Sequence, residues 1–285
     1  MQISKLPGPF GAEVTDLELT KDMRDETMRA LIQALFDNQI LLIRQQDLTE
    51  ADYVKFGYFW GTPLSFFIES HKRVDFPEMI RIQNKASTPA RHRDGAMHWH
   101  SDSSYEELPA TVTMLYGVEA PAIGGETLLA STTLAYEALP EAKKQMLDGL
   151  IGLHCLGGSP ELPGEKIPFI PESTALHGIQ KHPLVMPHPV TGRKALFPSG
   201  TTFSFEGAER EEGRALITEL RAHCVQPQFV NAVKVGKGDI LLWDNYQTMH
   251  TATAIEYSDE DGKRRLLYRI STKGIPDLFK QNADA

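Results

Sequence analysis

The sequence predicts one mainly-β domain with helices at its periphery. Short runs that are rich in β-branched residues and bounded by Gly or Pro dominate the middle of the chain. No internal repeat, low-complexity tract or shift in composition marks a domain boundary. The hydrophobic content, 41% of 285 residues, is ordinary for a globular protein and allows a sizeable core. We therefore expect a single domain over residues 1–285.

The N-terminal part predicts two helices around one buried strand. Residues 20–39 place Met28, Leu31, Ile32 and Leu35 at helical spacing, with acidic residues in the first turn. The run "ILLIRQ" that follows is a buried-strand candidate. Thr49 and Asp52 form a capping-box pattern, so a second helix is expected to begin there.

Further along, strand-like runs alternate with a few helical segments. The expected strands lie in "ATVTMLYGVEAP", "GGETLLAST", "GDILLWDN" and "RRLLYRIST", and two more flank a Thr191-Gly192 turn in "HPLVMPHPVTGRKALFP". Residues 132–155 and 208–224 are rich in helix-forming residues, which predicts a helix in each on the outside of the sheet. Residues 156–180 hold too many Gly and Pro for regular structure and indicate a long loop or lid.

Composition excludes several classes of partner. The formal net charge is −9 and no dense Lys/Arg block occurs, so neither nucleic acid nor an anionic membrane surface is an expected partner. Cys155 and Cys224 form no CxxC pattern, which argues against a disulfide framework or a thiolate zinc site and favours a reducing cytosol. No apolar run approaches the roughly 18 residues that span a bilayer, and the N-terminus lacks an apolar signal region. A cytoplasmic protein is expected.

The stretch "HWHSDSSYEE" at residues 98–107 is the first candidate for chemistry. If it is extended, its two-residue period places His98, His100 and Asp102 on one face. Two histidines and a carboxylate are the ligand set of non-haem Fe(II) oxygenases. His250 is the best candidate for a further ligand, because it follows a buried apolar strand that ends in polar residues. Other histidines have plainer interpretations: His92 lies in a charged run, and His182 and His188 flank prolines in a hairpin.

Six ordered blocks make the sequence similar to the taurine dioxygenase and dichlorophenoxyacetate dioxygenase family of Fe(II)- and 2-oxoglutarate-dependent oxygenases. The blocks are "GAEVTDLEL", "WHSDSSY", "GGETLLAS", "HPLVMPHPVTGRKALF", "GDILLWDNYQTMH" and "RRLLYR". The resemblance implies a double-stranded β-helix (jelly-roll) core. It also implies that His100, Asp102 and His250 bind the iron and that His98 does not.

The same resemblance assigns roles around the metal. Thr127 and Arg265 are expected to hold the distal carboxylate of 2-oxoglutarate, for which a planar guanidinium and a hydroxyl are suited. The alternative for Arg265 is a solvated partner of the acidic run "SDEDGK". Arg269 lies four residues later on the same strand face and is expected to grip an acidic group of the primary substrate. The "WDN" turn is expected to aim His250. Three further residues are expected at the substrate pocket, His71, Tyr105 and Phe203, and for Tyr105 plain core packing is the alternative.

The implied reaction uses Fe(II), 2-oxoglutarate and O2 to hydroxylate a C–H bond of a small organic acid, a carboxylate, sulfonate or sulfate ester, with succinate and CO2 as coproducts. Taurine itself is not expected, because "DGAM" before the motif lacks the asparagine-rich run of the taurine enzyme. Relatives commonly form dimers or tetramers. Two alternatives stay open: a cupin-like metalloenzyme that binds metal through His98, His100 and His250 without 2-oxoglutarate, and a non-enzymatic β-sandwich binding module.

Overall fold

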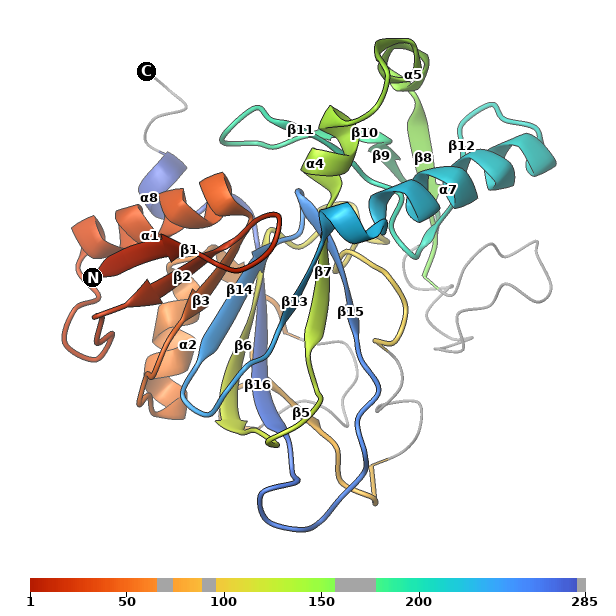
Figure 1. Cartoon of the computed structure of the whole chain (residues 1–285). Helices are drawn as coiled ribbons and strands as arrows, with labels where there is room; N and C mark the ends of the chain where they lie inside the picture. Colours follow the sequence, from red (N-terminus) through yellow and green to blue (C-terminus); the bar gives the residue numbers. More distant parts are fainter. Residues whose placement is uncertain (66–73, 89–95, 157–177, 281–285) are drawn as a thin grey trace.

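Two facing sheets form the centre of the molecule (Figure 1). The computed structural model describes residues 1–65, 74–88, 96–156 and 178–280. The larger sheet has eight strands in the order β1-β2-β3-β14-β6-β16-β4, with β5 also paired to β16. Their bounds are Gln2–Lys5 (β1), Ala12–Thr15 (β2), Ile40–Ile43 (β3), Thr62–Pro63 (β4), Ile80–Gln83 (β5), Val112–Glu119 (β6), Ile240–Asp244 (β14) and Leu266–Lys273 (β16). Only β2 and β3 pair in parallel among the described strands of this sheet.

The opposite sheet has the order β13-β7-β15, and all of its pairs are antiparallel. Its strands are Thr127–Ser131 (β7), Val230–Val233 (β13) and Thr248–Ala252 (β15). Two smaller sheets, β12-β8-β9 and β10-β11, extend the fold beyond one end of this sandwich. Their strands are Ile151–His154 (β8), Gln180–Pro183 (β9), Val185–Pro187 (β10), Lys194–Leu196 (β11) and Thr202–Phe205 (β12). This mainly antiparallel double sheet is the predicted jelly-roll core.

The core consists of layers on the two sides of the larger sheet. Leu241 and Trp243 of β14 pack with Leu129 of β7 and Leu267 of β16 between the two sheets. The alternate residues of β14, such as Leu242, pack instead against the helices on the outer side. Because β14 is buried on both faces, its sequence is a continuous apolar run and does not alternate between apolar and polar residues.

The helices cover the outside of the sheets, as expected (Figure 1). Helices α1 and α2 pack on the outer face of the larger sheet, and α4 and α7 pack with β10 and β11 in a separate apolar cluster. The helices are Asp25–Asn38 (α1), Glu50–Tyr58 (α2), Thr132–Glu137 (α4), Glu141–Leu147 (α5), Arg210–Cys224 (α7) and Asp277–Lys280 (α8), with a short 3-10 turn at Pro227–Phe229 (η2). No helix in the described part of the chain is both long and apolar enough to cross a bilayer.

The local predictions are mostly confirmed. The capping box is present, since the Thr49 hydroxyl accepts from the Asp52 N–H and the Asp52 carboxylate accepts from the Thr49 N–H. The expected Thr191-Gly192 turn joins β10 and β11, with Gly192 at φ +68°. The helical prediction for residues 132–155 is wrong at its end, because Ile151–His154 forms β8 between two partner strands. Most of the predicted lid, residues 157–177, lies outside the described residues.

Candidate active site

His100 and Asp102, the histidine and aspartate of an HxD motif in which x is any residue, meet His250 of β15 at the inner face of the β13-β7-β15 sheet. His100 and His250 form an antiparallel bridge in which each N–H donates to the other carbonyl, at 3.0 and 2.8 Å. The Asp102 carboxylate lies 3.7 Å from the Nε2 atom of each ring. One donor atom from each residue lies within 4.8 Å of the other two, and within the described ranges this is the only such group of three or more His, Cys, Asp or Glu residues. The arrangement matches a three-ligand face for one metal ion.

His98 contributes its backbone to this cluster. Its carbonyl oxygen lies 2.7 Å from Nδ1 of His100, which places the ring hydrogen on Nδ1 and leaves the Nε2 lone pair free toward Asp102 and His250. The His98 ring stacks on the His100 ring at a centroid distance of 4.7 Å. The His98 and His100 rings thus lie on the same face of the chain, as the two-residue period predicts. His98 nevertheless does not belong to the cluster of possible metal ligands. This geometry disfavours the cupin-like ligand set of three histidines.

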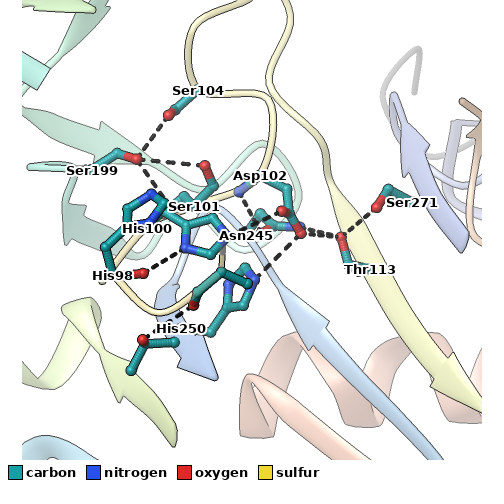
Figure 2. A network of polar contacts seen from close by, with 12 residues as sticks. His98, His100, Ser101, Asp102, Ser104, Thr113, Ser199, Asn245, His250 and Ser271 are labelled. Carbon is teal, nitrogen blue, oxygen red and sulfur yellow. Dashed lines mark hydrogen bonds and ion pairs between the residues drawn. The ribbon is translucent and has the colours of Figure 1, made fainter. Parts of the chain in front are cut away.

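Asp102 is fixed by a polar network that reaches both sheets (Figure 2). The Thr113 hydroxyl on β6 donates to Asp102 Oδ2 at 2.6 Å. Asn245 accepts from the Asp102 N–H at 3.1 Å and donates to the Thr113 hydroxyl at 3.0 Å. Ser271 of β16 contacts the same hydroxyl at 2.9 Å. The carboxylate thus accepts directly from Thr113, whose hydroxyl is positioned by Asn245 and Ser271, and this network orients Asp102 before any metal binds.

The "WDN" turn contacts two members of the cluster, His250 and Asp102. The Trp243 ring packs on the His250 ring at a centroid distance of 4.5 Å, as the prediction that this turn aims His250 requires. Asn245, however, bonds Asp102 and the Trp243 indole N–H, and not His250. The Nδ1 atom of His250 is buried and has no hydrogen-bond partner among the described residues. The turn thus aims His250 by packing and Asp102 by hydrogen bonds.

The protonation states suit metal binding. Burial lowers the pKa of His100, and for His250 burial together with the neighbouring His100 lowers the pKa well below its ordinary value. Burial alone would raise the pKa of Asp102, but Arg269 and the two histidines outweigh it and hold this pKa below its ordinary value. At neutral pH the cluster therefore offers two neutral imidazoles and one carboxylate, the forms that bind a metal cation.

The two predicted arginines lie at β16: Arg265 immediately precedes the strand and Arg269 belongs to it. Leu267, which lies between them, packs in the core between the sheets, so Arg265 and Arg269 on the same face point into the sandwich. Arg269 reaches the cluster, with Nη2 2.7 Å from Asp102 Oδ1. The neighbouring Arg264 points the other way and pairs with Glu119 and Asp261. The arginine that partners the acidic loop is thus Arg264, and the solvated alternative for Arg265 does not hold.

Arg265 lies partly buried against the start of β7. Its Nη1 has only a long contact, 3.4 Å, to the carbonyl of Gly125, and its Nε is buried without a partner in the described part of the chain. Gly125 has φ +79°, and a Cβ there would lie 3.4 Å from the Arg265 Cδ. Burial lowers the pKa of Arg265, although a guanidinium stays charged. Thr127, two residues after Gly125, is buried on the same face of β7 as Leu129, toward the core between the sheets.

Of the three predicted pocket residues, the structure describes Tyr105 and Phe203, and it places Tyr105 close to the cluster. Tyr105 follows the motif and is close enough to Arg269 and Asp102 for both charges to act on its pKa, which burial raises above its ordinary value. Phe203 is half-buried at an irregularity in β12, where the register to β8 shifts. His71 lies outside the described residues.

Comparison with known proteins decides the family. The model of the family described as "Taurine catabolism dioxygenase TauD, TfdA family" matches residues 2–271. The chain belongs to this family. The TauD/TfdA assignment agrees with the resemblance of the six blocks, and with the placement of the HxD motif opposite β15.

Individual TauD/TfdA relatives align along almost their whole length. The chain is 30% identical over 275 residues to the alpha-ketoglutarate-dependent 2,4-dichlorophenoxyacetate dioxygenase of Cupriavidus pinatubonensis, covering 92% of this chain and 94% of that protein. It is 28% identical to an alkylsulfatase of Acinetobacter baylyi, over 96% of this chain and 85% of that protein. The crystal structure of AAD-2 in complex with Mn(II) and N-oxalylglycine superposes with a TM-score of 0.81 at 26% identity, covering 96% and 98% of the two chains.

Sequence reasoning missed the residues that support Asp102. Thr113 lies in a run of ordinary strand formers, and nothing in the run sets this threonine apart. Its role arises only because β6 lies beside β14 and β16 and presents the hydroxyl to the motif. Asn245 carried a usable signal, since a polar residue at the end of a buried strand, just before a candidate ligand, indicates a site.

Proposed function

We propose that this TauD/TfdA protein hydroxylates a C–H bond of a small organic acid and that the acid is held by Arg269. The protein is an Fe(II)- and 2-oxoglutarate-dependent dioxygenase, as its family membership and its His-Asp-His cluster support. The whole chain is proposed to form one dioxygenase domain. Its cytoplasmic location and a dimeric or tetrameric assembly are further proposals that rest on composition and on the family.

The metal is assigned to the cluster. His100, Asp102 and His250 would hold Fe(II), because the donor set of two neutral imidazoles and one carboxylate is the one that non-haem Fe(II) oxygenases use. When bound together with 2-oxoglutarate and O2, the iron supplies the oxidative chemistry that forms succinate and CO2 and oxidises a C–H bond. The chain itself fixes the three ligands through Thr113, Asn245 and the bridge between His100 and His250.

The cosubstrate is assigned to residues at the start of β7 and just before β16, which belong to opposite sheets. Arg265 fits a carboxylate, because its buried Nε lacks a partner in the described chain and its Nη1 has only a long contact. A buried cationic donor without an anionic partner is costly, and a bound carboxylate removes that cost. Thr127 supplies a hydroxyl from β7 in the opposite sheet, where it is buried on the same strand face as Leu129.

One observation carries the substrate assignment. Arg269 lies 2.7 Å from Asp102, so an acid gripped by this guanidinium lies next to the metal, with its adjacent carbons within reach of the oxidant. Tyr105 and Phe203, together with His71, are proposed to shape the pocket around the remainder of the molecule. The relatives named as a 2,4-dichlorophenoxyacetate dioxygenase and as an alkylsulfatase support a carboxylate or sulfate ester as substrate.

The test is a panel of acids with matched neutral compounds. Aryloxyalkanoates, alkyl sulfates and alkyl sulfonates would each be paired with the alcohol or ether of equal length, and succinate and product would be quantified together. We expect succinate formation coupled to product for at least one acid and for none of the neutral compounds. His250→Ala should abolish turnover, whereas His223→Ala, a half-buried histidine of α7, should not. Turnover that prefers the neutral compounds would refute the role of Arg269.

A further inference from the structure

A second buried histidine-carboxylate contact lies outside the metal cluster. His188, in the turn between β10 and β11, places Nε2 2.9 Å from Oδ2 of Asp244, the last residue of β14. Both side chains are 0% exposed. Sequence analysis predicts only that His188 flanks a proline in a hairpin. Burying a polar pair of this kind is costly unless its remaining donors and acceptors are satisfied, so its contacts need an explanation.

The contacts of the ring fix its tautomer. Nδ1 accepts from the backbone N–H groups of Val190 at 3.2 Å and Thr191 at 2.9 Å. A nitrogen that faces two donors must present its lone pair, so the ring hydrogen is on Nε2, on the side of Asp244. The N–H lies off the direct line to the oxygen, and the contact is therefore a short electrostatic one rather than a linear hydrogen bond.

Asp244 in turn organises the turn at residues 244–247. Its Oδ1 accepts from the Tyr246 N–H at 2.9 Å, and its Oδ2 accepts from the side chain of Gln247 at 2.8 Å. Its backbone carbonyl accepts from the Thr248 hydroxyl at 2.7 Å. The carboxylate is thus the centre of the turn that begins β15 and carries Asn245.

The next step along the chain reaches the metal cluster. Asn245 accepts from the Asp102 N–H and donates to Thr113, whose hydroxyl donates to Asp102 Oδ2 (Figure 2). The β10-β11 turn is therefore linked to the motif carboxylate through one turn and one side chain. Every contact in this link is made by a buried residue, so solvent does not compete for it.

We propose that His188 is a positioning residue for the metal site: by holding Asp244 it fixes the turn at residues 244–247, and through Asn245 it sets the orientation of Asp102. The proposal rests on the proposed function, since it takes Asp102 to be a metal ligand. It gives the hairpin block "HPLVMPHPVTGRKALF" a part in metal binding, although none of its residues belongs to the cluster.

The test measures the metal without turnover. Anaerobic Co(II) titrations of the full chain, followed by visible absorption, report both the dissociation constant and the coordination geometry. His188→Leu should weaken Co(II) binding about 10- to 100-fold, the usual range for residues that orient metal ligands, and should change the shape of the spectrum. His188→Gln, which restores a donor and an acceptor, should recover affinity to within about threefold.

A matched control separates positioning from loss of stability. Leu31→Ala removes a fully buried side chain of α1 that has no polar link to the site. It should lower the melting temperature while Co(II) affinity and spectrum stay as in the wild type. The proposal is overturned if His188→Leu binds Co(II) like the wild type, or if Leu31→Ala weakens binding to the same extent.

Two further outcomes are decided in advance. If His188→Leu does not fold, the same Co(II) titration is made on the near-isosteric variant Asp244→Asn. Wild-type Co(II) affinity in that variant overturns the proposal. If the wild type itself takes up no Co(II), the assignment of the metal site fails and the positioning role fails with it. Wild-type binding with unchanged variants, by contrast, refutes only the role of His188.

Discussion

Replacing Arg265 with Gln should weaken 2-oxoglutarate binding far more than metal binding. In the structure the guanidinium offers a buried Nε that has no partner among the described residues and an Nη1 with only a 3.4 Å contact, so two donors remain for a carboxylate. Hydrogen bonds to a charged group contribute about 1.5–3 kcal/mol each, and the glutamine amide keeps one ordinary bond of about 1 kcal/mol. The net loss is about 2–5 kcal/mol, which corresponds to roughly 30- to 5000-fold in the dissociation constant.

The assay is an anaerobic titration of the Fe(II)-loaded protein with 2-oxoglutarate, followed by the visible charge-transfer absorption of the complex. Arg264→Gln is the matched control, because Arg264 is the adjacent residue on the opposite strand face and pairs with Glu119 and Asp261 at the surface. We expect the control to stay within about threefold of the wild type. The reasoning is refuted if Arg265→Gln also stays within threefold, or if both variants lose affinity equally.

Three other outcomes are expected. Thr113→Val removes the 2.6 Å bond to Asp102 without changing side-chain size, and should weaken Co(II) binding about 10- to 100-fold while Thr113→Ser stays close to the wild type; equal affinity of the Val and Ser variants would contradict this. His98→Ala should keep metal binding within about threefold, because the variant keeps the backbone carbonyl that bonds His100 and His98 is not in the cluster; abolished binding would restore the cupin-like ligand set. Saturating Mn(II), at about 100 times its dissociation constant, should stabilise the wild type by about 2.7 kcal/mol in chemical unfolding and should leave His250→Ala unchanged; equal stabilisation of both would place the ion elsewhere.

Features set by local chemistry were predictable from the sequence. The capping box of α2, the Gly192 turn and the strand character of β14 and β16 depend on residues close together in the chain, and the structure contains each of them. The HxD motif belongs to the same class, because a spacing of two residues suffices to bring His100 and Asp102 together. Its partner His250 was recognisable by its position at the end of a buried run.

Features set by contacts between distant strands were not predictable. Ile151–His154 follows a helical segment in the sequence, yet it forms β8 because β9 and β12 flank it on both sides. Thr113 supports Asp102 only through the pairing of β6 with β14 and β16. In the "WDN" turn, Trp243 packs on His250 whereas Asn245 bonds Asp102. Which residue of the turn contacts which ligand is likewise visible only in the three-dimensional structure.

The inner face of β16 shows why charge, more than hydrophobic pattern, identifies the site. Its other face packs apolar residues against α1 and α2, which alone would account for a stable strand. The inner face instead carries Arg269 and Lys273, with Arg265 just before the strand, and placing cations inside a sandwich is unfavourable unless anions meet them. Asp102 meets Arg269 and Glu106 meets Lys273, at 2.7 and 2.6 Å. For the buried Nε of Arg265 the described chain provides no partner, which is the pattern expected of a position that a dicarboxylate cosubstrate completes.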